Sequence, residues 1–159
     1  MRIHVIGIGT AHADDAAGLA VAALLASRPL PAGVFVLSCA RPLPDLLDAL
    51  DGADAAVLVD AARTGGAPGA LHRFAPGDLA QLRSPSSHGL GVAQALALAS
   101  ALGRAPARVE LLAIEAGPLR GEALSPAVAA SIAGAAEAAL EIARALQDGG
   151  EVAIAEPAH

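Results

Sequence analysis

The feature that most constrains the fold is a run of five apolar residues, 55–59, that ends directly at Asp60. A strand that is apolar on both faces is typical of a parallel sheet with helices on each side. Two similar strands precede it, at residues 2–8 and 34–37. The order βαβαβ predicts an α/β fold. The helices of this unit are expected where apolar residues have helical spacing, at residues 18–27 and 44–50.

The second half of the chain supplies the remaining elements. A turn-rich segment leads to a short strand at residues 70–74, and such a tight connection allows it to run antiparallel at the sheet edge. An apolar helix over residues 88–102 follows, with Ser86 or Ser87 placed to cap it. The last two elements are a strand at residues 109–114 and a long helix that begins with Ser125 and Pro126.

These elements predict a three-layer α/β/α architecture with a mostly parallel, twisted five-stranded sheet. The length of 159 residues fits one domain, which we expect to cover residues 1–148, followed by a loose C-terminal tail at 149–159. Only Phe35 and Phe74 are aromatic, so the core is expected to consist of Ala, Val, Leu and Ile.

Charge and cysteine content exclude several classes of protein. A net charge of −6 without a basic run argues against nucleic-acid binding, which requires clustered Lys and Arg. Cys39 is the only cysteine, so neither an internal disulfide nor a cysteine-based zinc site can form. The first residues lack the pattern of a signal peptide, and the alanine-rich residues 92–103 and 126–147 are too polar or too short for a membrane span. We therefore expect a soluble, cytoplasmic protein without nucleic-acid or membrane partners.

Polar side chains follow the strands that such a sheet places side by side. Right-handed crossovers in a βαβαβ unit give the order 2-1-3, so the carboxyl ends of the first and third strands meet at the ligand crevice. Asp14 and Asp15 follow the first strand, Asp60 follows the third, and His88 begins a helix that leads back to the sheet. Two carboxylates and an imidazole suit zinc or nickel, and a helix N-terminus favours the neutral, metal-binding form of His88.

Each of these residues also has a structural interpretation. Capping preference favours Asp14 as the N-cap of the first helix, and Asp15 fits equally well as an acidic first-turn residue. Position alone leaves Asp60 open between a functional and a structural role, and a solvated cap residue is the commoner role for His88. The remaining assignments are His4 to structure, His72 to the surface, His159 to the tail, and Arg41 and Arg63 to the same sheet edge, facing solvent or an acidic substrate.

A dinucleotide-binding loop is the main rival interpretation, because Gly7 and Gly9 follow the first strand as in such loops. The third glycine of that motif is replaced by His12, and no acidic residue ends the second strand. The chain contains no lysine, which excludes a P-loop. No motif identifies a serine as a nucleophile, and a lone cysteine such as Cys39 is more often inert and buried.

Four short motifs occur in a characteristic order: GIGTAHADDAAG at residues 7–18, VLVDA at 57–61, SSHGLG at 86–91 and LSP at 124–126. This order resembles that of the hydrogenase maturation endopeptidases, and the resemblance covers about residues 1–147. It implies a twisted five-stranded sheet between helices. It also implies that Asp15, Asp60 and His88 are both the metal-engaging and the catalytic residues.

The resemblance implies a role late in the assembly of nickel-iron hydrogenases. The partner is the large-subunit precursor, from which the family removes the C-terminal extension once nickel has been inserted. Nickel therefore comes with the substrate, and zinc or cadmium is expected to substitute in vitro. No activated serine, activated cysteine or permanent zinc is expected, and a monomer is favoured.

The sequence departs from the family pattern at two places near the predicted crevice. Thr10 stands where the family usually has Asn, and residues 38–42, SCARP, replace a glycine-rich turn. The leading hypothesis is a nickel-dependent processing endopeptidase. One alternative is a paralogue that binds the nickel-loaded precursor as an assembly chaperone without cleaving it, and a second is a nucleotide-binding module.

Overall fold

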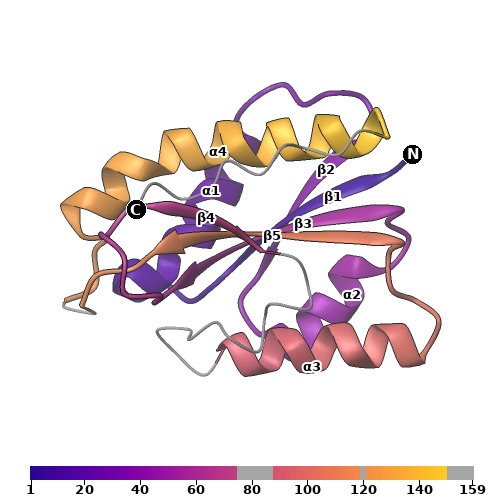
Figure 1. Cartoon of the computed structure of the whole chain (residues 1–159), viewed down its shortest axis with the longest axis horizontal. Coiled ribbons are helices and arrows are strands. Elements are labelled where there is room, and N and C mark those ends of the chain that lie inside the picture. The colour runs from indigo at the N-terminus through magenta and orange to yellow at the C-terminus, as the bar shows by residue number, and fades with distance from the viewer. Residues whose placement is uncertain (75–87, 119–120, 150–159) are drawn as a thin grey trace.

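The computed structural model describes residues 1–74, 88–118 and 121–149. In this part of the chain a five-stranded sheet lies between two layers of helices (Figure 1). The strand order is β2-β1-β3-β5-β4, and only β4 runs antiparallel to its neighbour, β5. The predicted fold, the 2-1-3 order and the antiparallel edge strand are thus confirmed. The strands are β1 (Ile3–Ile8), β2 (Val34–Cys39), β3 (Ala55–Ala62), β4 (Leu71–Phe74) and β5 (Arg108–Glu115).

Strand β3 lies at the centre of the sheet because the apolar side chains on both of its faces can be buried there. All eight of its residues are buried. Val57 packs in one core cluster, and Leu58 packs in a second cluster on the opposite face. The strand continues to Ala62 instead of ending before Asp60. Asp60 therefore lies within the strand, and its side chain alternates to the face of Leu58.

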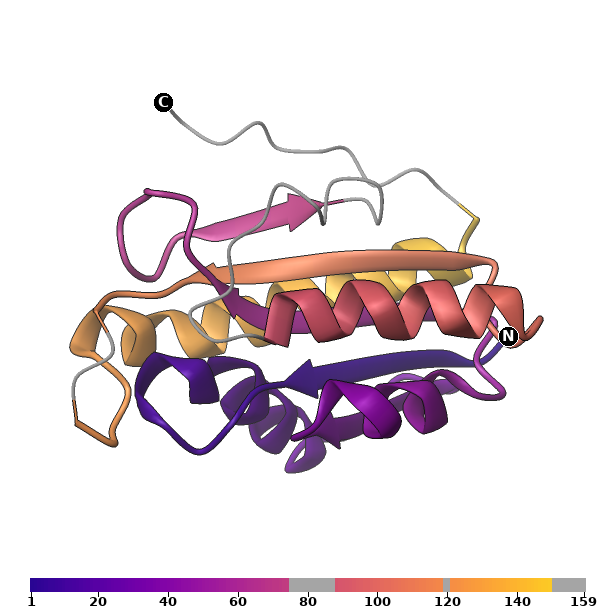
Figure 2. The same ribbon diagram turned by 90° about the horizontal axis from the view of Figure 1, so that it is seen from below.

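Helices cover both faces of the sheet, and Figure 2 shows α2 and α3 in front of the sheet and α4 behind it. Helices α1 and α4 pack together over the face of Val57, whereas α2 and α3 cover the face of Leu58. The predicted helices are confirmed to within a few residues. The helical elements are the 3₁₀ turn η1 (Ala13–Ala16), α1 (Ala17–Ala26), the π-helical turn η2 (Pro42–Leu46), α2 (Leu47–Leu50), α3 (His88–Ala101) and α4 (Pro126–Gln147).

Glycines allow α1 to lie very close to the sheet. A Cβ atom added to Gly7 would lie 2.2 Å from the carbonyl oxygen of Gly18, and one added to Gly18 would lie 2.3 Å from the carbonyl oxygens of Ile8 and Val59. The close-packed interior cannot accommodate such distances unless the backbone moves. Gly7, the first glycine of the loop considered for dinucleotide binding, therefore serves the packing of the helix on the sheet.

Helix α4 is the one helix in the described residues that is long and apolar enough to cross a membrane by length and composition alone. The expectation that residues 126–147 are too polar or too short for such a span is therefore wrong. In the structure the helix packs on the sheet and against α1, and a buried core helix meets the same criteria. The buried residues on its core-facing side are Val128, Ala135, Ala136, Ala139, Leu140, Ile142, Ala143 and Leu146.

Candidate functional site

The carboxyl ends of the parallel strands meet at one edge of the sheet, on the left in Figure 1, and the turn η1 follows β1 at this edge. Asp14 and Asp15 lie in η1, and Asp60 lies near the end of β3, the neighbour of β1. All three side chains are buried, and the exposed fractions of these residues are 1%, 1% and 6%. Because a buried carboxylate is costly unless it has partners, the partners of each residue indicate its role.

Asp60 has few partners for a buried carboxylate. The backbone N–H of Ala61 donates to its Oδ1 at 2.8 Å, and this is the one hydrogen bond of the side chain within the described residues. Burial raises the pKa of Asp60 well above its ordinary value, the Ala61 N–H acts to lower it, and the negative charge of Asp15 raises it further. Asp60 therefore favours a bound proton or cation, and Asp15 lies near enough for its charge to act on it.

Asp15 is held by the loop that precedes it. Oγ1 of Thr10 donates to Oδ2 of Asp15 at 2.5 Å, and the backbone N–H of Thr10 donates to the backbone oxygen of Asp15 at 3.2 Å. The loop folds back closely at Gly9, where a Cβ atom would lie 2.0 Å from that same oxygen. Thr10, which departs from the family pattern, thus orients one of the predicted ligands.

Asp14 has a structural role, because it links η1 to the segment between β5 and α4, and it does not cap a helix. Its carboxylate accepts hydrogen bonds from the N–H of Gly117 at 2.9 Å and from the N–H and Oγ of Ser125 at 2.7 and 2.8 Å. The N-cap positions of η1 and α1 are His12 and Ala16, and neither side chain makes a capping hydrogen bond. The prediction that Asp14 caps the first helix is therefore wrong. Ser125 occupies the N-cap of α4 as predicted, but its hydroxyl binds Asp14 instead.

His88, the third predicted ligand, is the first residue of α3. This helix covers the face of the sheet to which the side chain of Asp60 alternates. The side chain of His88 and the predicted cap residues Ser86 and Ser87 lie outside the described residues. Within the part of the chain that the structure describes, no three His, Cys, Asp or Glu side chains are grouped as a metal site requires. Asp15 and Asp60 form a pair there, and the three-ligand site stays a prediction.

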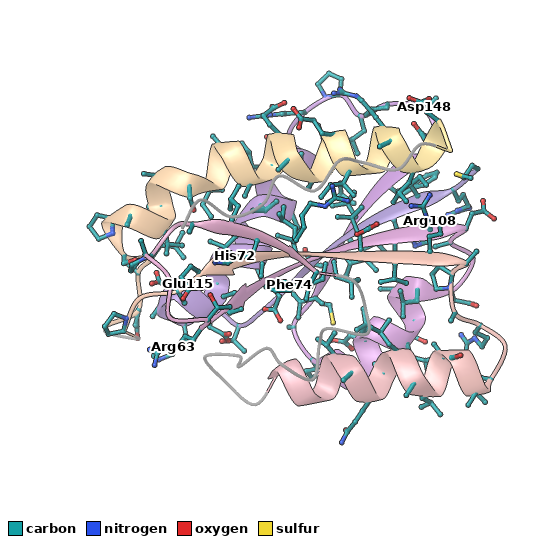
Figure 3. The ribbon with its side chains drawn as sticks, in the orientation of Figure 1. Arg63, His72, Phe74, Arg108, Glu115 and Asp148 are labelled. Atoms are coloured by element: carbon teal, nitrogen blue, oxygen red, sulfur yellow. The ribbon has the colours of Figure 1, made fainter. Side chains whose placement is uncertain are left out.

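Sequence reasoning misses Glu115, a buried carboxylate at the end of β5. Glu115 accepts hydrogen bonds from the N–H and Oγ1 of Thr64, at 2.9 and 2.8 Å, and from the N–H of Gly66 at 2.8 Å. Its Oε2 lies 3.3 Å from Nε2 of His72, whose side chain is only 15% exposed and not at the surface as expected; Figure 3 shows the two residues at the same end of the sheet. Burial acts to raise the pKa of Glu115, but these partners outweigh it and the pKa is lowered. The available signal was an acidic residue ending a buried strand, as at Asp60.

His4 and Cys39 have the structural roles expected of them. Nδ1 of His4, a residue that is 4% exposed, lies 2.7 Å from the backbone oxygen of Ala49. Burial raises the pKa of the Cys39 thiol to about 11, and the charges of Asp45 and Asp60 act in the same direction. The thiol is therefore protonated at neutral pH and is not activated as a nucleophile.

Two open depressions flank the segment that follows β5. The smaller, of about 280 Å³, is lined by Arg63 and other residues of the β3–β4 connection, together with residues 115–118. The larger, of about 580 Å³, lies between η1 and the start of α4, and Asp14 is part of its lining. Pro118 contributes to both, so the depressions adjoin each other, and the larger one reaches Asp14.

Comparison with known proteins assigns the family. Residues 21–142 match the family model described as hydrogenase maturation protease. The chain belongs to the hydrogenase maturation protease family. The resemblance inferred from the four motifs is thereby confirmed, and the matched residues include Asp60 and His88, while Asp15 precedes them. A comparison with curated proteins gave no match.

Solved structures of hydrogenase maturation proteases share the fold over nearly the whole chain. The hydrogenase maturating endopeptidase HybD from E. coli is 29% identical, with a TM-score of 0.77 and 97% of each chain covered. The [NiFe] hydrogenase maturation protease HybD from Thermococcus kodakarensis is 27% identical, with a TM-score of 0.74, 90% of this chain and 99% of that chain covered. HycI from Thermococcus kodakarensis KOD1, also a [NiFe] hydrogenase maturation protease, is 25% identical, with a TM-score of 0.67, 90% of this chain and 92% of that chain covered.

Proposed function

We propose that this hydrogenase maturation protease is an endopeptidase that removes the C-terminal extension of a nickel-iron hydrogenase large-subunit precursor, and that it recognises the precursor by its nickel. The observation that carries the proposal is the buried pair Asp15 and Asp60 at the carboxyl edge of the sheet. Two buried carboxylates that repel each other create a site that a divalent cation stabilises. In this proposal the protein acts in the cytoplasm as a monomer, and the nickel is part of its substrate.

The donor set fits nickel in its chemistry. Carboxylate oxygens and an imidazole nitrogen bind first-row divalent metals, so Asp15, Asp60 and His88 would hold the nickel of the precursor. A bound divalent metal polarises a carbonyl group and lowers the pKa of water, which is the chemistry that peptide hydrolysis requires. The fold offers no competing nucleophile at Cys39, whose thiol stays protonated.

The chain's own residues prepare the two carboxylates. Thr10 holds Oδ2 of Asp15, and the Ala61 N–H holds Oδ1 of Asp60, so each side chain has a fixed orientation before the substrate binds. Because burial raises the pKa of Asp60, its carboxyl group retains a proton more strongly than an exposed one does. Binding of the precursor's nickel would release that proton, so affinity for the nickel-loaded precursor is expected to increase with pH.

A cleavage assay tests the proposal directly. The purified protein is mixed with nickel-loaded and with nickel-free large-subunit precursor, and loss of the extension is followed by mass spectrometry. The wild type is expected to shorten only the nickel-loaded form, whereas Asp15→Asn, Asp60→Asn and His88→Ala are inactive. Asp48→Asn, which changes an exposed carboxylate on α2, is the matched control and should cleave normally. Equal cleavage of the nickel-free precursor would contradict recognition by nickel.

A metal titration tests the site without the precursor. Calorimetry with nickel or cadmium compares the wild type with the same three variants and with Asp48→Asn. One binding site that all three substitutions abolish and the control keeps would support the three ligands. Variants that bind the metal as tightly as the wild type would refute the assignment of these residues.

The chaperone alternative is favoured by one feature of the site. Residues 38–42 depart from the family pattern. Cys39, within this segment, lies near enough to Asp60 for the charge of Asp60 to act on its thiol. A chaperone would bind the nickel-loaded precursor and leave its mass unchanged. The mass-spectrometric assay above therefore distinguishes the two functions when it is combined with a measurement of complex formation.

A further inference from the structure

We propose that Arg63 binds an acidic side chain in the precursor's extension, within the depression of about 280 Å³ that it lines, and thereby selects which extensions are accepted. This inference rests on the proposed function. It assigns a role to an arginine that lies at the same edge of the sheet as the carboxylate pair without belonging to it. Three features of Arg63 support this role: its position, its unused hydrogen-bond donors and the space beside it.

Arg63 is connected to the carboxylate edge through one residue, Gly117. Nη2 of Arg63 donates to the backbone oxygen of Gly117 at 3.1 Å, and the N–H of Gly117 donates to Asp14, the neighbour of Asp15. Arg63 also follows Asp60 by three positions in the chain. Three residues of extended chain span about 10 Å, so a peptide held at Asp15 and Asp60 reaches Arg63 with about its third residue.

The guanidinium group of Arg63 is available for an anion. Within the described residues it has no carboxylate partner at ion-pair distance, whereas Arg28, Arg41, Arg73 and Arg104 each have one. Its bond to a backbone oxygen uses one of five N–H donors. Figure 3 shows Arg63 at the end of the sheet where Glu115 and His72 lie, with its guanidinium group pointing away from the sheet.

The depression beside Arg63 has room for a side chain and little negative charge of its own. Among the described residues its walls consist mainly of small side chains, and Glu115 is the acidic one. That carboxylate is already engaged by Thr64, Gly66 and His72, so its negative charge is compensated within the fold. With a net charge of −6 the protein as a whole repels acidic peptides, so a cation such as Arg63 at the site can act as an effective selector.

The chemistry of the pair favours Glu or Asp over neutral residues. Arginine and carboxylate form charge-assisted, often two-pronged hydrogen bonds, which are stronger than neutral ones. At a solvent-accessible position such a pair is expected to change affinity by about twofold to fivefold. The effect belongs to binding, so it should appear in Kd and KM more than in kcat.

The test uses the full-length protein and nickel-loaded large-subunit precursor from the same organism, with Glu, Gln or Lys placed in turn at the second, third and fourth residues of the extension. Kd is measured by fluorescence anisotropy for the wild type, Arg63→Gln and Arg63→Glu. The wild type should prefer Glu over Gln by about twofold to fivefold at one of these positions and bind Lys least. Arg63→Gln should lose the preference, and Arg63→Glu should bind the Lys version best.

Arg144→Gln is the control, because it removes the same charge from an exposed side chain on α4 and should keep the wild-type preference. Equal binding of the three versions by the wild type, binding of none of them, or an unchanged preference in Arg63→Gln overturns the inference. The proposed function fails separately: binding with the expected preference but no cleavage refutes the endopeptidase and leaves the role of Arg63 standing. Cleavage without the preference refutes the role of Arg63 and leaves the endopeptidase standing.

Discussion

Asp60 and Glu115 occupy similar positions and have opposite environments. Each is a buried acid near the end of a buried strand, on the neighbouring strands β3 and β5, and their side chains alternate to the same face of the sheet. Glu115 has two hydrogen bonds from Thr64, one from Gly66 and a nearby imidazole. Within the part of the chain that the structure describes, Asp60 has one backbone N–H and a second negative charge, that of Asp15, in place of these partners.

The two pKa values shift in opposite directions because the partners of the two acids differ, although burial acts in the same direction on both. Burial acts to raise the pKa of both groups, but the donors around Glu115 reverse the shift and those around Asp60 do not. A carboxylate whose charge is satisfied by the fold has a structural role. One that has few positive partners among the described residues is available for a cation from outside, and this is the physical basis for proposing the function at Asp60.

The largest expected effect is that of Asp60→Asn on cleavage. Under the proposed function Asp60 engages the metal, so its loss should lower the rate on nickel-loaded precursor by about a thousandfold or more. The same substitution should leave the free energy of unfolding at neutral pH unchanged or higher, because it removes a buried carboxyl group that has one hydrogen bond within the described residues. Rate and stability are measured on the same preparation by mass spectrometry and urea denaturation. If Asp60→Asn lost stability and kept its rate, Asp60 would have the structural role that is assigned here to Glu115.

Glu115→Gln should affect stability most. The amide keeps the shape of the carboxylate but replaces charge-assisted hydrogen bonds with neutral ones and directs an NH₂ group at donors from Thr64 or Gly66. We expect a loss of about 2 kcal/mol in the free energy of unfolding, measured by urea denaturation. Glu110→Gln, on the same strand but more exposed, should cost less. Equal costs for the two variants would mean that the hydrogen bonds of Glu115 contribute little.

The sequence predicts the order of the strands better than it predicts the hydrogen-bond partners of the buried acids. The apolar run before Asp60 predicted a central buried strand, and the crossover rule then placed the carboxyl ends of β1 and β3 together. The role of Asp14 could not be predicted, because its partners Gly117 and Ser125 lie 103 and 111 positions away. The same holds for Glu115, whose hydrogen-bond partner Thr64 lies 51 positions away in the sequence. Local preference favoured a helix cap at Asp14, and long-range hydrogen bonds overruled it.

The pH dependence of stability should differ in sign between the two acids. The folded-state pKa of Asp60 is raised above its ordinary value of 3.8, so its contribution is fully present below that pH and is lost as pH rises through the folded pKa. The pKa of Glu115 is lowered from 4.5, so its contribution is present above that pH and is lost as pH falls through the folded pKa.

Urea denaturation at a series of pH values tests this difference. Relative to the wild type, Asp60→Asn should gain stability as pH rises from about 4 to about 8, and the deficit of Glu115→Gln should shrink as pH falls below about 4.5. Parallel curves for the two variants would show that the environments of the two acids do not differ as their partners indicate.

The smallest expected effect is that of Thr10, which supplies Asp15 with a hydroxyl donor; Asp60 has no such donor among the described residues. Thr10→Val keeps the shape of the side chain and removes the hydroxyl that donates to Oδ2 at 2.5 Å. Asp15 should then hold its orientation less well, and cleavage should fall by about tenfold, which corresponds to about 1.4 kcal/mol. Thr10→Ser keeps the hydroxyl and should retain most of the rate. If Val and Ser behave alike, Thr10 acts by packing alone, and the orientation of Asp15 depends on the backbone bond between the two residues, which both variants keep.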